Sequence, residues 1–240
     1  MQKIKGVFFD LGGTLRICEA VPEHQQQAMA RMAQLAGQTD VAGFMDTVES
    51  RYEGYRQWAL TENREAGDFD LWAKWLLPEY PREQIAGFCH EMTYQYRQAK
   101  GLRHLVPGGR EVLQTLHRRG YRLGIISNLI GEREIYDWLK ADGLEPLFDS
   151  VVLSSVCHIR KPDPEMYRMG CRELGLGPEE CASVADNLDR DITGAKAAGI
   201  GANVLFISPK KLAKKTITDA NRPDYIVHRF PDILDLPLFG

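Results

Sequence analysis

The stretch Phe8-Phe9-Asp10-Leu11-Gly12-Gly13-Thr14-Leu15 stands close to the start of this 240-residue chain. The apolar run at residues 7–9 predicts a buried strand. A carboxylate at the tip of such a strand, followed closely by two glycines, predicts a sharp turn at an exposed crevice. Ligands bind in that crevice in open α/β sheets. Asp10 is therefore expected to act as a nucleophile or as a metal ligand.

Beyond residue 101, strand-like and helical patterns alternate along the chain. Apolar, β-branched runs predict strands at residues 122–126, 151–153, 183–185, 204–207 and 225–227. Such alternation predicts an α/β fold with a Rossmann-like parallel sheet and helices on both faces. Right-handed crossovers would place the carboxyl ends of the strands at one edge of that sheet.

The segment before residue 101 has only helical patterns. Four apolar stripes at helical spacing lie between residues 20 and 100. Asp40 is expected to cap the second helix, and Pro81 to occupy the first position of the fourth. We therefore predict a small four-helix domain at residues 17–100, inserted into an α/β core made of residues 1–16 and 101–240.

Composition and charge narrow the possible classes of protein. The formal net charge is −3, which gives no basic field for nucleic acid, and the lysines at residues 210–215 are expected to form a solvated face. No segment approaches the ~20 apolar residues of a membrane span, and the first residues lack the apolar region of a signal peptide. The five scattered cysteines fit no zinc site and favour a reduced, cytoplasmic compartment. A monomer and a homodimer both remain open.

Reactive side chains follow four of the predicted elements in order. They are Asp10, the pair Ser127-Asn128, Lys161 within Arg160-Lys161-Pro162-Asp163-Pro164, and Asp186 with Asp191. Each of these stretches alone could be an ordinary turn or the start of a helix. Neither interpretation explains why all four occur together. Carboxylates at Asp10 and Asp186 suit Mg²⁺, and Asp10 can attack phosphorus. The Lys161 ammonium, the Ser127 hydroxyl and the backbone N–H groups of the turns can neutralise phosphoryl oxygens.

At this point the chain resembles the haloacid dehalogenase-like hydrolase superfamily. Four stretches match its motifs in order, and they are Phe8-Phe9-Asp10-Leu11-Gly12-Gly13-Thr14-Leu15, Ile125-Ile126-Ser127-Asn128, the stretch from Arg160 to Tyr167, and the stretch from Val184 to Ala195. The resemblance implies a phosphatase-type enzyme whose helical insertion is a cap domain that closes over the site and selects the substrate.

The resemblance also implies roles for individual residues. Asp10, Ser127 and Lys161 would be catalytic. Gly13, Thr14, Ser127, Asn128 and Lys161 would bind a small phosphorylated substrate. Mg²⁺ would be held by Asp10, the backbone carbonyl of Gly12, Asp186 and Asp191. The substrate itself, and which of the cap's arginines and aromatic residues meet it, stay open.

Gly12 departs from the superfamily's phosphatase pattern. There the first motif reads Asp-x-Asp, and its second Asp protonates the leaving group, a contribution typically worth ~10²–10⁴ in rate. Three readings follow, and we favour the first: a Mg²⁺-dependent phosphatase that forms an aspartyl-phosphate and takes its proton elsewhere, with Glu19, Glu23 and His24 as candidates. The second is a carbon–halogen hydrolase that uses Asp10 on carbon. The third is a non-catalytic member that binds a phosphate or a metabolite.

Overall fold

The computed structural model describes residues 3–240. Its centre is a sheet of six strands in the order β5-β4-β1-β6-β7-β8, and every neighbouring pair is parallel. The α/β prediction is confirmed, and so is each predicted strand to within two residues at either end. The strands are β1 (Gly6–Phe9), β4 (Arg122–Ser127), β5 (Ser150–Leu153), β6 (Cys181–Ala185), β7 (Ala202–Phe206) and β8 (Tyr225–Val227).

Alternation of side chains along β1 builds a core on each face of the sheet. Val7 and Phe9 point to the face covered by α5 (Gly109–Arg118), α6 (Arg133–Ala141) and the C-terminal turn η5 (Phe230–Asp235). Phe8 points to the other face, which α8 (Glu165–Leu174) and α9 (Thr193–Ala198) cover. Each buried aromatic or aliphatic side chain contributes about 1.5–3 kcal/mol to folding. The remaining short elements are α7 (Ser154–Cys157), α10 (Pro209–Leu212), η2 (Glu145–Leu147), η3 (Pro178–Glu180), η4 (Leu188–Ile192) and η6 (Pro237–Phe239).

The strands that follow β1 in the sequence lie on both sides of it in the sheet. β1 pairs with β4 on one edge and with β6 on the other, so the strand order reverses at β1. Such a switch point leaves a crevice beyond the carboxyl ends of the strands. Asp10 follows β1 directly and therefore lies at this crevice.

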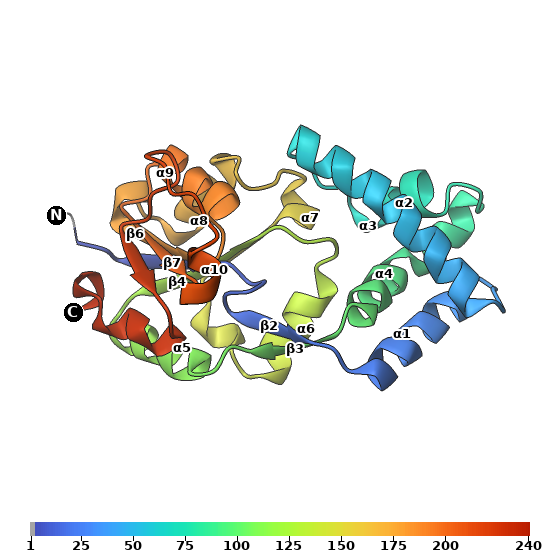
Figure 1. The fold of residues 1–240 in the computed structure, drawn as a ribbon, viewed down its shortest axis with the longest axis horizontal. Coiled ribbons are helices and arrows are strands. Elements are labelled where there is room, and N and C mark those ends of the chain that lie inside the picture. Colours follow the sequence, from blue (N-terminus) through green and yellow to red (C-terminus); the bar gives the residue numbers. More distant parts are fainter. Residues whose placement is uncertain (1–2) are drawn as a thin grey trace.

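Four helical segments gather at one end of the molecule, away from the sheet (Figure 1). They have a hydrophobic cluster of their own, which includes Met32, Val48, Trp72 and Tyr96. The segments are α1 (Pro22–Leu35), α2 (Val41–Glu62), the turn α3 (Asp68–Asp70) continued by the π-helical η1 (Leu71–Leu76), and α4 (Arg82–Ala99). We call them the cap; a domain boundary at residues 17 and 100 stays a prediction.

Two details of the cap follow from local chemistry. Asp40 accepts a hydrogen bond from Gly43 N at 3.0 Å, which confirms it as the N-cap of α2. Pro81 immediately precedes α4 and is its N-cap, so the prediction that it takes the first helical position is wrong by one residue. Proline suits either place, because the first backbone N–H groups of a helix have no partner within it.

A two-stranded antiparallel ribbon joins the cap to the sheet, and the sequence analysis did not foresee it. β2 (Arg16–Glu19) pairs with β3 (Leu102–Leu105), so the chain leaves and re-enters the sheet region side by side. Beside it, Arg16, Arg97 and Arg103 all contact the buried carboxylate of Glu134 on α6. This ion cluster ties the ribbon and α4 to the sheet region.

A second contact joins the cap to the sheet region near Glu65. The Glu65 carboxylate is fully buried and accepts hydrogen bonds from Tyr55 in the cap and from Ser154 and Arg160 beyond the sheet. A backbone hydrogen bond supports this contact, in which Glu65 N donates to His158 O at 3.2 Å. The cap is thus attached to the sheet region at two separate places. Within residues 3–240 the helices are all too short or too polar to cross a bilayer.

Candidate active site

Asp10 lies at the bottom of the crevice with its two carboxylate oxygens in different surroundings. Its backbone N–H donates to Val184 O at 3.0 Å, which continues the pairing of β1 with β6. Oδ1 accepts a hydrogen bond from Lys161 Nζ at 2.8 Å and lies 3.4 Å from Ser127 Oγ. Oδ2 is buried and has no hydrogen-bond partner within residues 3–240. A buried carboxylate oxygen without a donor is costly, so this atom is suited to a ligand.

Lys161 is fixed at both its backbone and its side chain. Nζ also donates to Ile126 O at 2.7 Å and contacts Asp191. The side-chain amide of Asn128 accepts from Lys161 N at 2.8 Å and donates to Lys161 O at 2.9 Å. Both ends of that amide are therefore engaged with Lys161. Asn128 therefore positions the lysine in this structure, and its contact with a substrate stays a prediction.

Asp186 and Asp191 complete an acidic group around Asp10. One carboxylate oxygen from each of the three residues lies within 4.8 Å of the others. Asp186 follows β6 and is partly exposed, whereas Asp191 is fully buried on η4. Parallel strands end at the same edge of a sheet, and this topology brings together Asp10 and Asp186, which are far apart in the sequence.

The guanidinium of Arg190 lies within this acidic group, and the sequence analysis missed it. Its Nη2 is 3.0 Å from Asp191 Oδ2, 3.6 Å from Asp186 Oδ1 and 3.8 Å from Asp10 Oδ2. Its backbone N–H is capped by the side chain of Asn187 at 2.9 Å, which fixes the start of η4. Three carboxylates thus share two side-chain cations, Lys161 and Arg190, which leaves one excess negative charge at the centre.

Burial and mutual repulsion oppose ionisation of these carboxyls. Burial raises the pKa of Asp10, and the charge of Lys161 only partly offsets this effect. Burial together with the charges of Asp10 and Asp191 raises the pKa of Asp186 to about 6. Burial would lower the pKa of Arg190, but the three carboxylates outweigh it and raise that pKa. A further cation is therefore electrostatically favourable at this place.

The two glycines after Leu11 differ in what a side chain would meet. A Cβ on Gly13 would lie 2.3 Å from Asp186 Oδ2, and the φ angle of Gly13 is +82°, a conformation that favours glycine. A Cβ on Gly12 would meet no heavy atom of the described residues within 4 Å. Gly13 is thus required by the approach of Asp186, whereas a Cβ at residue 12 would have open space around it.

The residues considered as substitute proton donors have other contacts. Glu19 Oε2 lies 3.2 Å from His104 Nε2 on the ribbon, and His24 Nε2 lies 3.1 Å from Gln98 Oε1 at the base of the cap. Glu23 is exposed in the first turn of α1. Among the contacts of residues 3–240, none joins these three to Asp10. Thr14, predicted to bind substrate, is fully buried, and its hydroxyl has no partner in the described part of the chain.

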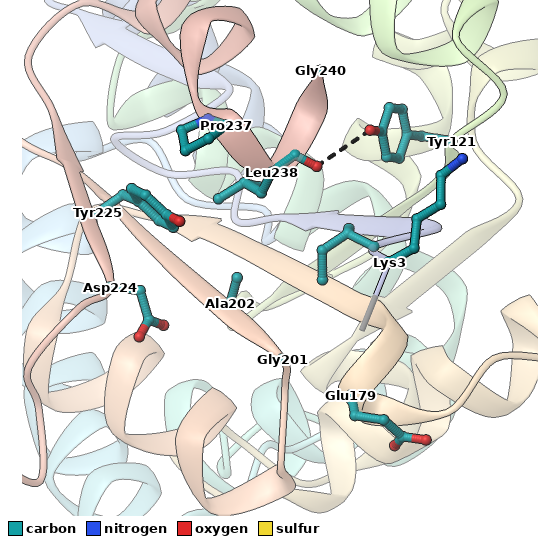
Figure 2. Close-up of a pocket in the computed structure, with 11 residues that line it drawn as sticks. Lys3, Tyr121, Glu179, Gly201, Ala202, Asp224, Tyr225, Pro237, Leu238 and Gly240 are labelled. Carbon is teal, nitrogen blue, oxygen red and sulfur yellow. Dashed lines mark hydrogen bonds between the residues drawn. The ribbon is translucent and has the colours of Figure 1, made fainter. Parts of the chain in front are cut away.

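A cavity of about 580 Å³ lies away from this site. Figure 2 shows residues that line it, among them Tyr121, Ala202 and Tyr225, which stand at the amino ends of β4, β7 and β8. Asp10 and Asp186 follow the carboxyl ends of β1 and β6 and lie at the opposite edge of the sheet. The cavity therefore contains no residue of the site described above.

Known proteins resemble this chain over nearly its whole length. It is 28% identical over 247 aligned positions to a glyceraldehyde 3-phosphate phosphatase of Pyrococcus furiosus, which covers 98% of this chain and 94% of that protein. It is 32% identical over 151 positions to pyrophosphatase PpaX of Halalkalibacterium halodurans, which covers 61% of this chain and 68% of the relative. A crystal structure of a 2-haloacid dehalogenase from Pseudomonas syringae superposes with a TM-score of 0.67 at 20% identity and 97% coverage of both chains.

That structural likeness shows the fold, because the identity is low. The family model described as haloacid dehalogenase-like hydrolase matches residues 4–199. This span includes Asp10, Ser127, Lys161, Asp186 and Asp191. This match and the phosphatase relatives confirm the expectation of an enzyme. The chain belongs to the haloacid dehalogenase-like hydrolases.

Proposed function

We propose that this hydrolase is a Mg²⁺-dependent phosphatase that acts on a small phosphorylated metabolite through an aspartyl-phosphate on Asp10. The observation that carries the proposal is the divided environment of the Asp10 carboxylate. Lys161 binds Oδ1 at 2.8 Å, whereas Oδ2 is buried without a hydrogen-bond partner in residues 3–240. The relatives named as phosphatases support the same reaction class.

The donor set fits Mg²⁺. This ion prefers oxygen ligands and commonly uses one or two carboxylates, with phosphate and water for the rest. Asp10, Asp186 and Asp191 place carboxylate oxygens within 4.8 Å of one another, and the excess negative charge described above favours a cation. Asp10, Asp186, Asp191 and the backbone carbonyl of Gly12 would hold the ion. Bound there, Mg²⁺ would neutralise charge on the phosphoryl oxygens.

The residues of the chain can carry two chemical steps. A carboxylate oxygen of Asp10 attacks phosphorus, the bond from phosphorus to the alcohol oxygen breaks, and that oxygen leaves with the electron pair. Water then attacks the aspartyl-phosphate, which releases inorganic phosphate and restores the carboxylate. Lys161 and Ser127 both reach Asp10 Oδ1, so their ammonium and hydroxyl are placed to bind the transferred phosphoryl group.

The leaving group receives no proton from position 12, because Gly12 has no side chain. A poor leaving group such as an alkoxide then depends on solvent or on another group of the substrate. An aryl or acyl phosphate leaves without much protonation and is affected less. We therefore expect turnover of aryl and acyl phosphates to exceed that of simple alkyl phosphates by a wider margin than in an enzyme with a carboxylate at residue 12.

Hydrolysis of p-nitrophenyl phosphate tests the proposal. Turnover should require Mg²⁺ and should be lost in Asp10→Asn. Asp189→Asn is the matched control, because this exposed carboxylate on η4 lies outside the site and accepts a hydrogen bond from Asn221, and within residues 3–240 it contacts no residue of the site. Turnover that persists in Asp10→Asn would refute the role of Asp10.

Two other outcomes would identify the other readings of Gly12. Halide release from a 2-haloacid without Mg²⁺ would indicate a carbon–halogen hydrolase. Binding of Mg²⁺ and phosphate, with no turnover over a broad panel of phosphate esters, would indicate a binding protein.

A further inference from the structure

A second cavity, of about 210 Å³, lies between the cap and the sheet region. Tyr52 and Tyr96 contribute to it from α2 and α4, and residues 128–130 contribute from the loop after β4. Its four charged lining residues are all cationic, and they are Arg97, Lys100, Arg103 and Arg160. A cavity needs only about 10–15 Å³ to hold one water molecule, so this one has room for a carboxylate or phosphate group.

This cavity adjoins the site around Asp10 through two pairs of neighbouring residues. Asn128 lines the cavity, and Ser127 beside it lies 3.4 Å from Asp10 Oδ1. Arg160 lines the cavity, and Lys161 beside it binds Asp10. The cavity therefore lies one residue away from two side chains that contact Asp10, close enough for a single substrate to be considered for both places.

Acidic partners do not fully balance the cations around this cavity. Glu134 is shared by Arg16, Arg97 and Arg103, whereas Glu49 pairs with Lys100 and Glu65 with Arg160. In these ion pairs of residues 3–240, five cations face three carboxylates. The three carboxylates stand outside the lining of the cavity, so the surface presented to a ligand is positive.

Several donors on the lining remain available. Arg97 binds Glu134 through Nε, and its Nη atoms have no hydrogen-bond acceptor in the described part of the chain. The Tyr52 hydroxyl likewise makes no hydrogen bond within residues 3–240. Burial and then the charge of Arg97 lower the pKa of Arg103, and the nearby Glu134 offsets these effects only in part. An anion in the cavity would offset them further.

We propose that the substrate carries, besides the phosphoryl group that meets Asp10, a second anionic group that binds in the cavity lined by Arg97, Lys100, Arg103 and Arg160. The proposal rests on the proposed function, because it takes the phosphoryl group to lie at Asp10. The second anion is a carboxylate or a second phosphate. Cations from both the cap and the sheet region would then bind one anionic group of the ligand and select for its negative charge.

A matched series of three-carbon phosphate esters tests this inference. All three probes carry a phosphate at one end. The other end is anionic in 3-phosphooxypropanoate and propane-1,3-diol bisphosphate and is a neutral hydroxyl in 3-hydroxypropyl phosphate, and the probes are called anionic or neutral by that end. Calorimetric titration with Asp10→Asn, in the presence of Mg²⁺, measures binding whether or not turnover occurs. We expect at least one anionic probe to bind about tenfold or more tightly than the neutral one, and the tighter of the two identifies the carboxylate or the phosphate. Equal affinity for all three probes would overturn the proposal.

Variants of the lining locate the effect. Arg97→Gln and Lys100→Gln, each combined with Asp10→Asn, should weaken binding of the preferred anionic probe about tenfold and leave the neutral probe within about twofold. Arg133→Gln is the control, because Arg133 pairs with Glu91 across the same border and does not line the cavity. A preference that survives both lining variants would also refute the proposal.

The two proposals fail in different ways. If p-nitrophenyl phosphate is hydrolysed only when Asp10 is intact, yet the anionic and neutral probes bind equally, the cavity inference alone is wrong. If Asp10→Asn retains turnover, the proposed function is wrong whatever the probes show.

Discussion

Arg190 Nη2 lies 3.8 Å from Asp10 Oδ2, the carboxylate oxygen that has no hydrogen-bond partner in residues 3–240. The same nitrogen is 3.6 Å from Asp186. A cation of the chain itself thus faces two of the carboxylates that we propose as Mg²⁺ ligands. Arg190 stabilises the acidic group in this structure, and it would compete for the same oxygens with the proposed Mg²⁺.

Replacement of Arg190 by Gln should therefore strengthen Mg²⁺ binding. At about 4 Å and an effective dielectric constant near 20, two unit charges interact by roughly 4 kcal/mol. Arg190 is about one-third exposed, so screening reduces this value. We expect a Kd for Mg²⁺ about tenfold lower, measured by calorimetry. Arg222→Gln, an exposed arginine paired with Asp219, should leave the Kd unchanged. Weaker binding in Arg190→Gln would show that the guanidinium supports the metal site.

Gly13→Ala should disturb the metal site and the fold together. The left-handed φ of +82° costs an L residue roughly 1–2 kcal/mol, and the new Cβ would press on Asp186 Oδ2. We expect the free energy of unfolding to fall by at least about that amount and Mg²⁺ affinity to fall as Asp186 moves. Urea denaturation and calorimetry measure the two effects.

Gly12→Ala is the neighbouring control, because its Cβ has open space and its φ lies outside the left-handed range. It should change stability by less than about 0.5 kcal/mol, as a typical substitution at an unconstrained site does. Equal losses in both variants would contradict the assigned role of Gly13.

The sequence was sufficient to predict how the site comes together. Asp10, Ser127 and Asp186 each end a strand, and a parallel sheet places such ends at one edge whatever the loops do. Lys161 and Asp191 were predicted to join this group from the order of reactive residues along the chain, and the structure brings the two into contact with each other. The strands themselves were recognisable because buried parallel strands are continuous apolar runs.

Other features depend on tertiary geometry that no local pattern encodes. In the sequence, Arg190 is one charge among the acidic residues at the start of a predicted helix. Its closeness to Asp186 in the chain was the one sign that it belongs to the site. The π-helical turn η4 places its guanidinium beside the carboxylate of Asp186. The cationic cavity combines Arg97 on α4 and Arg103 on β3 with Arg160, which lies far along the chain from both. Other arginines of the cap do not line this cavity; Arg51, for example, pairs with Glu79. The ribbon of β2 and β3 was missed because both strands are short and mostly exposed or half-buried.

The ion cluster around Glu134 predicts that the attachment of the cap to the sheet region, and with it the free energy of unfolding, depends on pH. Burial alone would raise the pKa of Glu134, but the charges of Arg97, Arg16 and Arg103 outweigh it and lower that pKa below its ordinary 4.5. A carboxyl with a lowered pKa in the folded state stabilises the fold above its unfolded pKa. That stabilisation is lost as the pH falls below about 4.5 towards the folded pKa.

Glu134→Gln should therefore be less stable than the wild type at pH 7 by about 2–3 kcal/mol, a magnitude typical of hydrogen bonds to charged groups. The difference should shrink as the pH falls below about 4.5. Urea denaturation over a range of pH measures both values. Glu145→Gln, an exposed carboxyl at the start of η2, should follow the wild type at every pH. A stability difference that does not vary with pH would mean that the cluster acts by packing and not by charge.

Gly12→Asp asks whether the missing carboxylate limits catalysis. A Cβ at this position would meet no heavy atom of residues 3–240 within 4 Å, so the backbone there accepts a side chain. A general acid typically contributes ~10²–10⁴ in rate, and it matters most where the leaving group is a poor one. We expect kcat for an alkyl phosphate to rise at least about tenfold more than kcat for p-nitrophenyl phosphate. Gly12→Asn, which has the same size and no titratable proton, should show no such selective gain. If both substrates gain equally, or neither gains, another group already protonates the leaving oxygen.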